Sequence, residues 1–206
     1  IINAMRLARP AGKFVYRHND VADLERALEE ASGKGERAIV VTDGIFSMRG
    51  DHAPLAEIAE LCRRYDDRFS ENVVLVVDDS HGVGAFGRTG RGTEEYTGAR
   101  CDILVGTLGK AFGVNGGYVT ADAAVIRFLR ETSPMYIYSN PITVGEAAAA
   151  LRALELLDGE WGHARLDRLR NLTRRFEQGL VDAGFETIPG EHPVVPLMVR
   201  DTARTR

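Results

Sequence analysis

The sequence contains an unbroken run of five apolar residues, VVLVV, at positions 73–77. A strand with one face in water alternates apolar and polar residues, whereas this run has no alternation. It therefore predicts a strand of a parallel sheet that is covered on both faces. The runs at 38–41, 103–105 and 118–119 are short, apolar and bounded by polar or glycine residues, and they predict further strands of the same sheet.

Amphipathic helices are predicted between and after these strands, at residues 20–31, 55–65, 122–132, 143–158 and 163–183. Alternation of strand and helix indicates an α/β layered domain with a mainly parallel sheet. The long helices after Pro141 and a late apolar strand at 194–199 predict passage into a small α+β domain. We predict a large domain over residues 1–155 and the start of the small domain over 156–206. Both are expected to be incomplete, because the chain lacks an initiator Met and ends on what reads as an unfinished helix.

Composition excludes several classes of function. The 206 residues carry a formal net charge of -4, which provides no basic surface for nucleic acid or for an anionic membrane. No apolar stretch approaches the roughly 18 residues of a membrane span. Cys62 and Cys101 have no CxxC spacing, so we expect reduced, packed thiols in a cytoplasmic protein.

Polar residues follow three of the predicted strands, at 42–48, 78–81 and 106–111. In open α/β sheets this carboxyl edge is where ligands bind. Lys110 stands out because its neighbours, residues 108–113, are small or apolar and are expected to shield its amine from water. Desolvation lowers the pKa of a lysine, and a neutral amine forms imines with aldehydes. The ordinary alternative is a solvated surface lysine.

Asp78 and His81 form the second candidate pair. A carboxylate at the end of an apolar strand is costly unless it meets a cation or hydrogen-bond donors. Asp78 could pair with a protonated pyridine nitrogen or could cap a turn, and His81 could bind a cofactor oxygen, move a proton or be an ordinary turn residue. A metal site at Asp78, Asp79 and His81 lacks a further ligand, so no metal is predicted.

Two other features of the strand ends leave alternatives open. Ser47 and Thr107 are hydroxyls suited to phosphate or ring contacts, although each could be a plain turn residue. Residues 82–87 (GVGAFG) match G-x-G-x-x-G, but a dinucleotide fingerprint follows its strand directly and opens a helix. Here four residues intervene and a loop continues through 88–92, so we do not predict a nicotinamide site.

Taken together, these motifs resemble those of the α-oxoamine synthases, which belong to the fold-type I pyridoxal phosphate (PLP) enzymes. Within that family the likeness is greatest to glycine C-acetyltransferases. It covers essentially the whole chain through TDGIFSM (42–48), VDDSHGVG (77–84), GRG (90–92), GTLGKAFG (106–113), YSN (138–140) and EHPVVPLM (191–198). The resemblance implies the three-layer, aspartate aminotransferase-like large domain.

The resemblance also implies roles for individual residues. Lys110 corresponds to the lysine that holds PLP as a Schiff base, Asp78 to the aspartate on the pyridine nitrogen and His81 to the histidine on the ring oxygen. Ser47 corresponds to a serine beside the ring and Thr107 to a threonine on the phosphate.

Ser139 and Asn140 match positions that reach the phosphate of the neighbouring subunit's cofactor, which implies a homodimer with shared active sites. The implied reaction condenses glycine, or another small amino acid, with an acyl-CoA. The family's ring-stacking histidine and carboxylate-binding arginine fall outside the chain, so the fragment alone is expected to be inactive. A shorter segment at 112–117 and an apparent insertion at 68–72 leave the acyl donor open.

Three alternatives remain from sequence. The first is another α-oxoamine synthase, such as an 8-amino-7-oxononanoate synthase. The second is a class I or II aminotransferase, because fold and cofactor are shared. The third is an α/β binding protein without catalytic activity.

Overall fold

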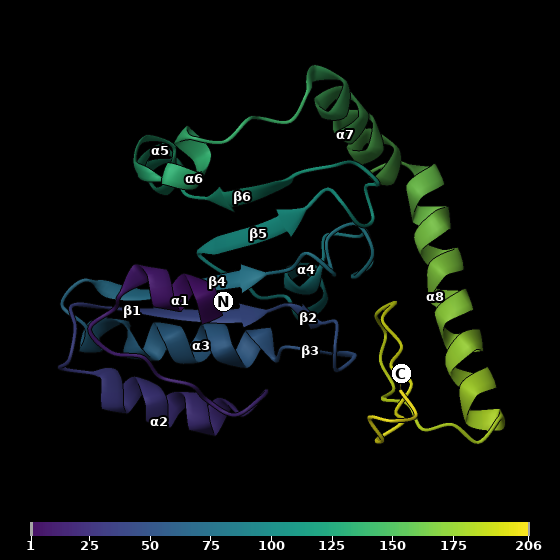
Figure 1. Ribbon diagram of the computed structural model, residues 1–206, viewed down its shortest axis with the longest axis horizontal. Coiled ribbons are helices and arrows are strands. Elements are labelled where there is room, and N and C mark those ends of the chain that lie inside the picture. Colours follow the sequence, from purple (N-terminus) through teal and green to yellow (C-terminus); the bar gives the residue numbers. More distant parts are fainter. Residues whose placement is uncertain (1, 206) are drawn as a thin grey trace.

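The computed structural model describes residues 2–205, and its centre is a four-stranded sheet in the order β1-β4-β5-β6 (Figure 1). The strands are β1 (Arg37–Asp43), β4 (Asn72–Asp78), β5 (Ile103–Thr107) and β6 (Gly117–Ala121). The first three run parallel, and β6 pairs antiparallel with β5. The prediction of a mainly parallel sheet is therefore confirmed.

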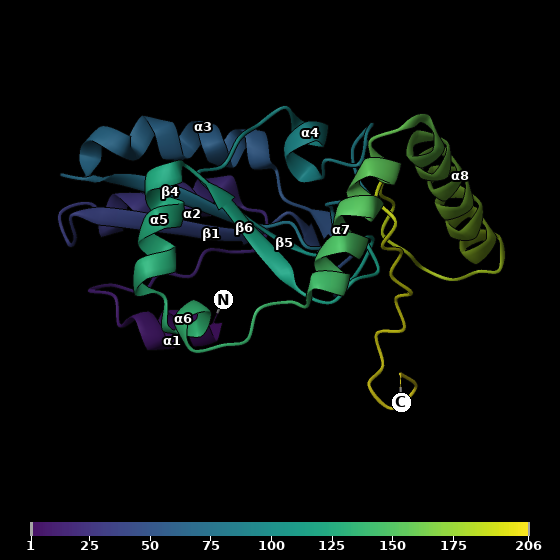
Figure 2. The ribbon, with the colours of Figure 1, turned by 90° about the horizontal axis from the view of Figure 1, so that it is seen from above.

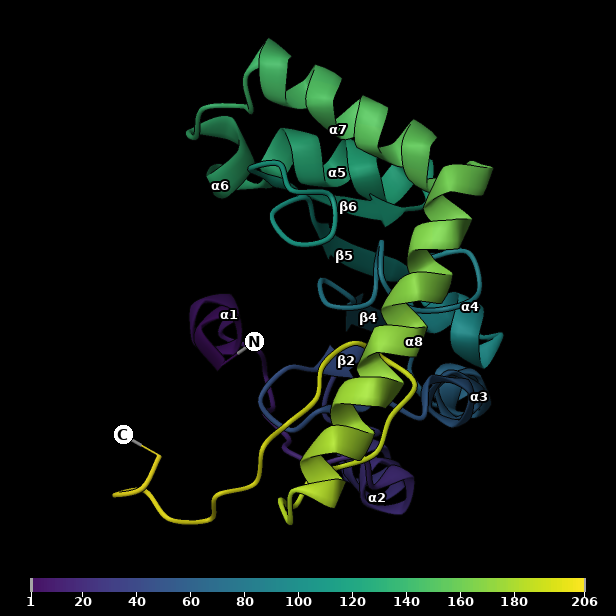
Figure 3. The same ribbon diagram turned by 90° about the vertical axis from the view of Figure 1, so that its right-hand side faces the viewer.

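One face of the sheet is well covered. Helix α3 (Leu55–Tyr65) packs on it, with α2 (Val21–Ala31) and the short α4 (Thr93–Thr97) beside α3 (Figure 3). Asp20 caps α2 by accepting a 2.9 Å hydrogen bond from the Asp23 backbone N–H. Burial of apolar side chains between these layers stabilises the domain. The main core includes Leu24, Leu28, Val40, Leu55, Ile58, Leu61, Cys62, Leu75 and Val77.

The other face is less covered than predicted. Ile39 of β1 is 63% exposed, and Val74 and Val76 of β4 are only half-buried. Helix α1 (Ile2–Ala8) lies on this side of the sheet in Figure 3. The expectation of full cover on both faces is wrong for residues 2–205, because a second helical layer of the extent of α2 and α3 is not present among them.

The second half of the chain is mainly helical: α5 (Ala123–Thr132), α6 (Pro134–Ile137), α7 (Val144–Leu157) and α8 (Glu160–Asp182). A capping box starts α7, in which the Thr143 hydroxyl and the Glu146 carboxylate each accept a bond from the other's backbone N–H. Ala150 of α7 packs with Val83, Leu108 and Phe112 in a second apolar cluster. Helix α8 runs past the carboxyl ends of the strands (Figures 2 and 3).

Some short elements of the structure differ from the predictions. The expected strand at 194–199 does not form, and an isolated bridge between Glu186 and Met198 stands in its place. Pro193 and Pro196 cannot donate to a ladder, which explains the failure. A small hairpin of β2 (Ile45–Phe46) and β3 (Asp51–His52), together with a 3-10 turn at Asp66–Arg68, was not predicted.

The division at 155/156 stays a prediction, although it falls in the last turn of α7, which continues to Leu157. Cys62 and Cys101 are both free thiols. Of the helices within residues 2–205, none combines the length and the apolar character that crossing a bilayer requires.

Candidate active site

Asp78, His81 and Lys110 lie at or just after the ends of the parallel strands β4 and β5. In the register of β1 and β4, Asp43 lies opposite Asp78, and Asp78 lies opposite Val105 of β5. These strand ends are level, so the segments that follow them share the carboxyl edge of the sheet (Figure 1).

At this edge, one of the two carboxylate oxygens of Asp78 is held by a hydrogen bond. Its Oδ1 accepts a 3.1 Å hydrogen bond from the Ser80 backbone N–H, and its backbone carbonyl accepts one of 2.8 Å from Gly44. Within residues 2–205, no hydrogen bond to its Oδ2 is found. Because the residue is only half-buried, that oxygen is available to a cationic ligand group.

His81 links the candidate residues electrostatically. Burial lowers the pKa of His81, the positive charge of Lys110 lowers it further, and the carboxylates of Asp78 and Asp43 oppose both effects. The imidazole is therefore neutral at pH 7. The charges of Lys110, Asp78 and Asp43 therefore act on the His81 ring at the edge where β1, β4 and β5 end.

Asp43 was not singled out from sequence. Burial raises the pKa of its carboxyl, and the charge of Asp78 raises it further. The available signal was its position at the carboxyl end of β1, level with Asp78.

Lys110 lies in the loop that joins β5 to β6. The Leu108 backbone N–H donates to the Gly116 carbonyl, and the Val114 N–H donates to the Leu108 carbonyl, both at 2.9 Å. The Gly113 N–H donates to the Lys110 carbonyl at 3.1 Å. Lys110 itself is exposed. The prediction that its neighbours shield it is wrong for this chain, because Leu108 and Phe112 turn away into the second apolar cluster.

Thr107 stabilises this loop. Its hydroxyl donates to the Gly116 carbonyl at 3.2 Å and accepts from the Gly109 backbone N–H at 3.1 Å. Ser47 is exposed in the turn between β2 and β3. The phosphate and ring contacts expected of these two hydroxyls stay predictions.

Ser139 and Asn140 are exposed in the connection between α6 and α7. The structure does not bring them into contact with Asp78, His81 or Lys110. Ile142 of the same connection lies close to Gly116 in the Lys110 loop. Their predicted role across a subunit boundary therefore stays a prediction.

From sequence, Asp79 could be a residue that supports its neighbours without touching a ligand, and in the structure it is 0% exposed. Its Oδ2 accepts a bond from the Thr93 backbone N–H and its Oδ1 one from the Thr93 hydroxyl, both at 2.7 Å. Burial raises the pKa of Asp79 to about 6, although both bonds from Thr93 oppose the rise. The signal for Asp79 in the sequence is a second carboxylate directly after an apolar strand.

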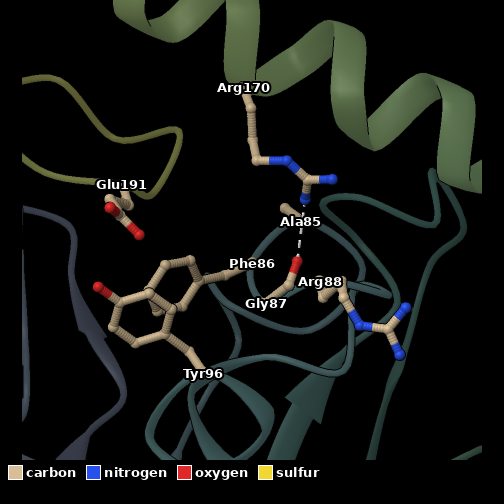
Figure 4. Close-up of a pocket in the computed structure, with 7 residues that line it drawn as sticks. All are labelled: Ala85, Phe86, Gly87, Arg88, Tyr96, Arg170 and Glu191. Atoms are coloured by element: carbon tan, nitrogen blue, oxygen red, sulfur yellow. Dashed lines mark hydrogen bonds between the residues drawn. The ribbon is translucent and has the colours of Figure 1, made fainter.

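A pocket of about 310 Å³ lies beyond this edge, where α8 and the C-terminal segment meet the loop after His81 (Figure 4). Arg170 of α8 donates from Nη1 to the Gly87 carbonyl at 3.1 Å. Phe86 and Tyr96 stack with ring centroids 4.3 Å apart, and Glu191 lies above them. The residues predicted for the cofactor do not line this pocket. Within residues 2–205, no group of three or more His, Cys, Asp or Glu side chains could hold a metal ion.

Comparison with known proteins identifies the relatives of this chain. The family model for aminotransferase class I and II matches residues 1–205. The 8-amino-7-oxononanoate synthase of Thermosipho melanesiensis is 39% identical over 203 residues, which are 98% of this chain and 49% of that protein. The 2-amino-3-ketobutyrate coenzyme A ligase of Salmonella typhimurium is 38% identical over 205 residues, again 98% and 49%.

Among solved structures, a lysine-to-alanine variant of a serine palmitoyltransferase from S. paucimobilis, with a bound PLP–myriocin aldimine, has a TM-score of 0.80 at 27% identity. The match covers 92% of this chain and 48% of that one. The chain spans about half the length of the curated relatives that it matches. The chain belongs to the aminotransferase class I and II family, within its PLP-dependent α-oxoamine synthases.

Proposed function

We propose that the protein carrying this chain is an acyltransferase that uses PLP to condense glycine, or another small amino acid, with an acyl-CoA. The observation that carries the proposal is the meeting of Asp78, His81 and Lys110 at the carboxyl edge of the sheet. A carboxylate, a neutral imidazole and an accessible amine are the groups that binding of a pyridine aldehyde requires.

The residues present fit PLP. Oδ2 of Asp78 is available to hold a pyridinium N–H, while Ser80 holds the other oxygen. The neutral ring of His81 suits an uncharged hydrogen bond to a ring oxygen. The exposed amine of Lys110 is free to react with an aldehyde. PLP, when bound, supplies an electron-withdrawing ring that stabilises negative charge on the α-carbon of an amino acid.

Residues of this chain would supply the charge, the proton transfer and the loop geometry that the reaction also needs. Asp78 keeps the pyridine nitrogen protonated through its negative charge. Lys110 Nζ takes and returns the proton of the substrate α-carbon. The Thr107 bonds to Gly109 and Gly116 hold the loop that presents Lys110. The proposed dimer, with Ser139 and Asn140 of one subunit at the partner's site, would complete the cofactor pocket.

Absorbance tests the cofactor assignment. In the full-length protein, we expect an absorbance band at about 420 nm that borohydride abolishes and that Lys110→Ala removes, because that band belongs to an imine on the lysine. Lys34→Ala is the matched control, since Lys34 is an exposed lysine that bonds Glu30 at 3.1 Å, away from the candidate site. A reducible band that persists in Lys110→Ala would contradict the assignment.

Substrate use separates the candidate functions. We propose glycine with acetyl-CoA as the first pair, and release of free coenzyme A thiol as the readout. The synthases of 8-amino-7-oxononanoate among the relatives support a second candidate, which prefers a different amino acid or a longer acyl chain. Glycine, alanine and serine are therefore each assayed with acetyl-CoA and with long-chain acyl-CoA. Thiol release from none of the pairs would favour an aminotransferase.

A further inference from the structure

Asp79 lies between two of the residues proposed to contact the cofactor, and its backbone is fully engaged. Its N–H donates to the Val105 carbonyl of β5 at 2.9 Å. Its carbonyl accepts bonds from Gly82 and Val83, both at 2.9 Å, which close the turn that carries His81. The backbone of Asp79 therefore ties this turn to the end of β5.

The Asp79 side chain points inward and joins three segments. Both oxygens accept 2.7 Å bonds from Thr93 at the start of α4. Gly44 after β1, Gly82 in the turn and Gly92 before α4 all face the carboxylate so closely that a Cβ on any of them would collide with it. The carboxylate thus fills a cage formed by the segments after β1 and β4 and the start of α4.

We propose that Asp79 is a positioning residue, which acts through Thr93 and this glycine cage to hold the Asp78 carboxylate and the His81 ring in their orientation toward the cofactor. The inference rests on the proposed function and adds a residue that itself touches neither cofactor nor substrate. Small displacements of catalytic groups greatly reduce ligand affinity and reaction rate. A rigid turn at residues 79–83 would therefore keep Asp78 and His81 in their working positions.

The chemistry of the cage favours positioning over simple packing. Burying a carboxylate is unfavourable, and an apolar side chain would fill the same space without that cost. The raised pKa of Asp79 reflects this cost. What the carboxylate provides instead is two directional bonds to Thr93, and these bonds define the path of the loop from residue 79 to residue 93.

The test uses the full-length protein with PLP and four variants. Asp79→Asn places an amide N–H against a donor of Thr93, Thr93→Val removes the hydroxyl, and Thr93→Ser retains both donors. Asp102→Asn is the matched control, because Asp102 accepts a 2.7 Å bond from the Leu75 backbone N–H at the opposite end of the same sheet. For each protein we measure PLP affinity, the pH titration of the absorbance at about 420 nm, and thermal stability.

We expect Asp79→Asn to weaken PLP binding about tenfold, which corresponds to about 1.4 kcal/mol, and to move the midpoint of the absorbance titration by about one pH unit. Thr93→Val shows the same changes to a smaller extent, and Thr93→Ser restores the wild-type profile. Asp102→Asn lowers stability without moving the profile. If Asp79→Asn does not fold, Thr93→Val decides the question.

Wild-type titration curves in both Asp79→Asn and Thr93→Val would overturn the inference, as would an equal change in Asp102→Asn. A failure of the proposed function is distinguishable. In that case the wild-type protein itself lacks an absorbance that depends on Lys110, and the positioning role fails with it.

Discussion

Asp78 and Asp79 are adjacent in sequence but have opposite environments. Successive residues at the end of a strand point to opposite sides. Asp78 is half-buried and holds one oxygen free, whereas Asp79 is fully buried with both oxygens bound to Thr93. One carboxylate is therefore suited to meet a ligand and the other to hold the turn.

The buried carboxylate of Asp79 predicts a pH dependence of stability. Its pKa is raised from 3.8 to about 6 in the folded protein, so the folded state binds the proton more tightly than the unfolded state. Stability therefore falls as pH rises from about 4 to about 6 and then levels off, by about 3 kcal/mol in total. We expect the free energy of unfolding of wild type, minus that of Asp79→Asn, to decline by this amount between pH 4 and pH 7.

Glu95 provides a control, because its effect on stability should change with pH in the opposite direction to that of Asp79. Burial raises the pKa of Glu95, but bonds from Thr89 and Arg91 outweigh it, so the pKa is lowered. The difference between wild type and Glu95→Gln should therefore grow as pH rises through the acid range. A difference for Asp79→Asn that is constant with pH would show that its carboxyl is not perturbed.

At the scale of elements, the loop from β4 to α4 depends on glycines with left-handed backbone conformations. Gly84, Gly87, Gly90 and Gly92 have φ between 80° and 83°. At Gly92 the conformation coincides with a close approach to Asp79, and its N–H also donates to the Phe86 carbonyl at 2.9 Å. The loop can pass around the Asp79 carboxylate because these positions carry no side chain.

Gly92→Ala and Gly98→Ala should separate the cost of a left-handed backbone conformation from the cost of a collision with Asp79. Both glycines have positive φ, at 83° and 70°, but a Cβ at Gly98 meets nothing within 4 Å whereas one at Gly92 collides with Asp79. Backbone strain alone costs about 1 kcal/mol, and the added collision brings the cost to about 3 kcal/mol or more. Chemical unfolding of both variants measures the difference, and equal losses would mean that the cage tolerates a methyl group.

At the scale of the whole molecule, large apolar side chains remain exposed around α5, α6 and the start of α7. They are Phe128, Met135, Tyr136, Ile137, Tyr138 and Val144, each between 48% and 87% exposed. Ser139 and Asn140 lie within this stretch. Apolar surface of this kind is typical of an interface, which supports the proposed dimer.

Subunit complementation tests the shared sites. A full-length Lys110→Ala protein and a full-length Ser139→Ala/Asn140→Ala protein should each have little activity. Mixed dimers rebuild one intact site from Lys110 of one subunit with Ser139 and Asn140 of the other. Random mixing should therefore recover about a quarter of wild-type activity.

The control mixes Lys110→Ala with Asp78→Asn. In the proposed site, Lys110 and Asp78 come from the same subunit. No mixed dimer of these two variants therefore contains an intact site. Recovery in this control, or none in the first mixture, would contradict an active site that both subunits build.

Much of the fold could be predicted because local patterns report it directly. The unbroken apolar run at 73–77 led to β4, and the apolar spacing behind Asp20 led to α2. The level strand ends also made the meeting of Asp78, His81 and Lys110 predictable, since parallel strands share a carboxyl edge. The 194–199 strand failed because a strand needs a partner and donors, which an apolar run alone does not supply.

Most of the strands and helices could be predicted from the amino-acid sequence, because apolar spacing is a short-range property of the chain, and the motifs at 42–48, 77–84 and 106–113 indicated the family and the candidate residues at the strand ends. The three-dimensional fold was needed to show that Asp79 is caged by Thr93 and three glycines, that Asp43 stands level with Asp78, and that the neighbours of Lys110 leave it exposed. The physical reason is that burial and pairing depend on segments far apart in sequence. No local pattern specifies which of two adjacent carboxylates those segments will enclose.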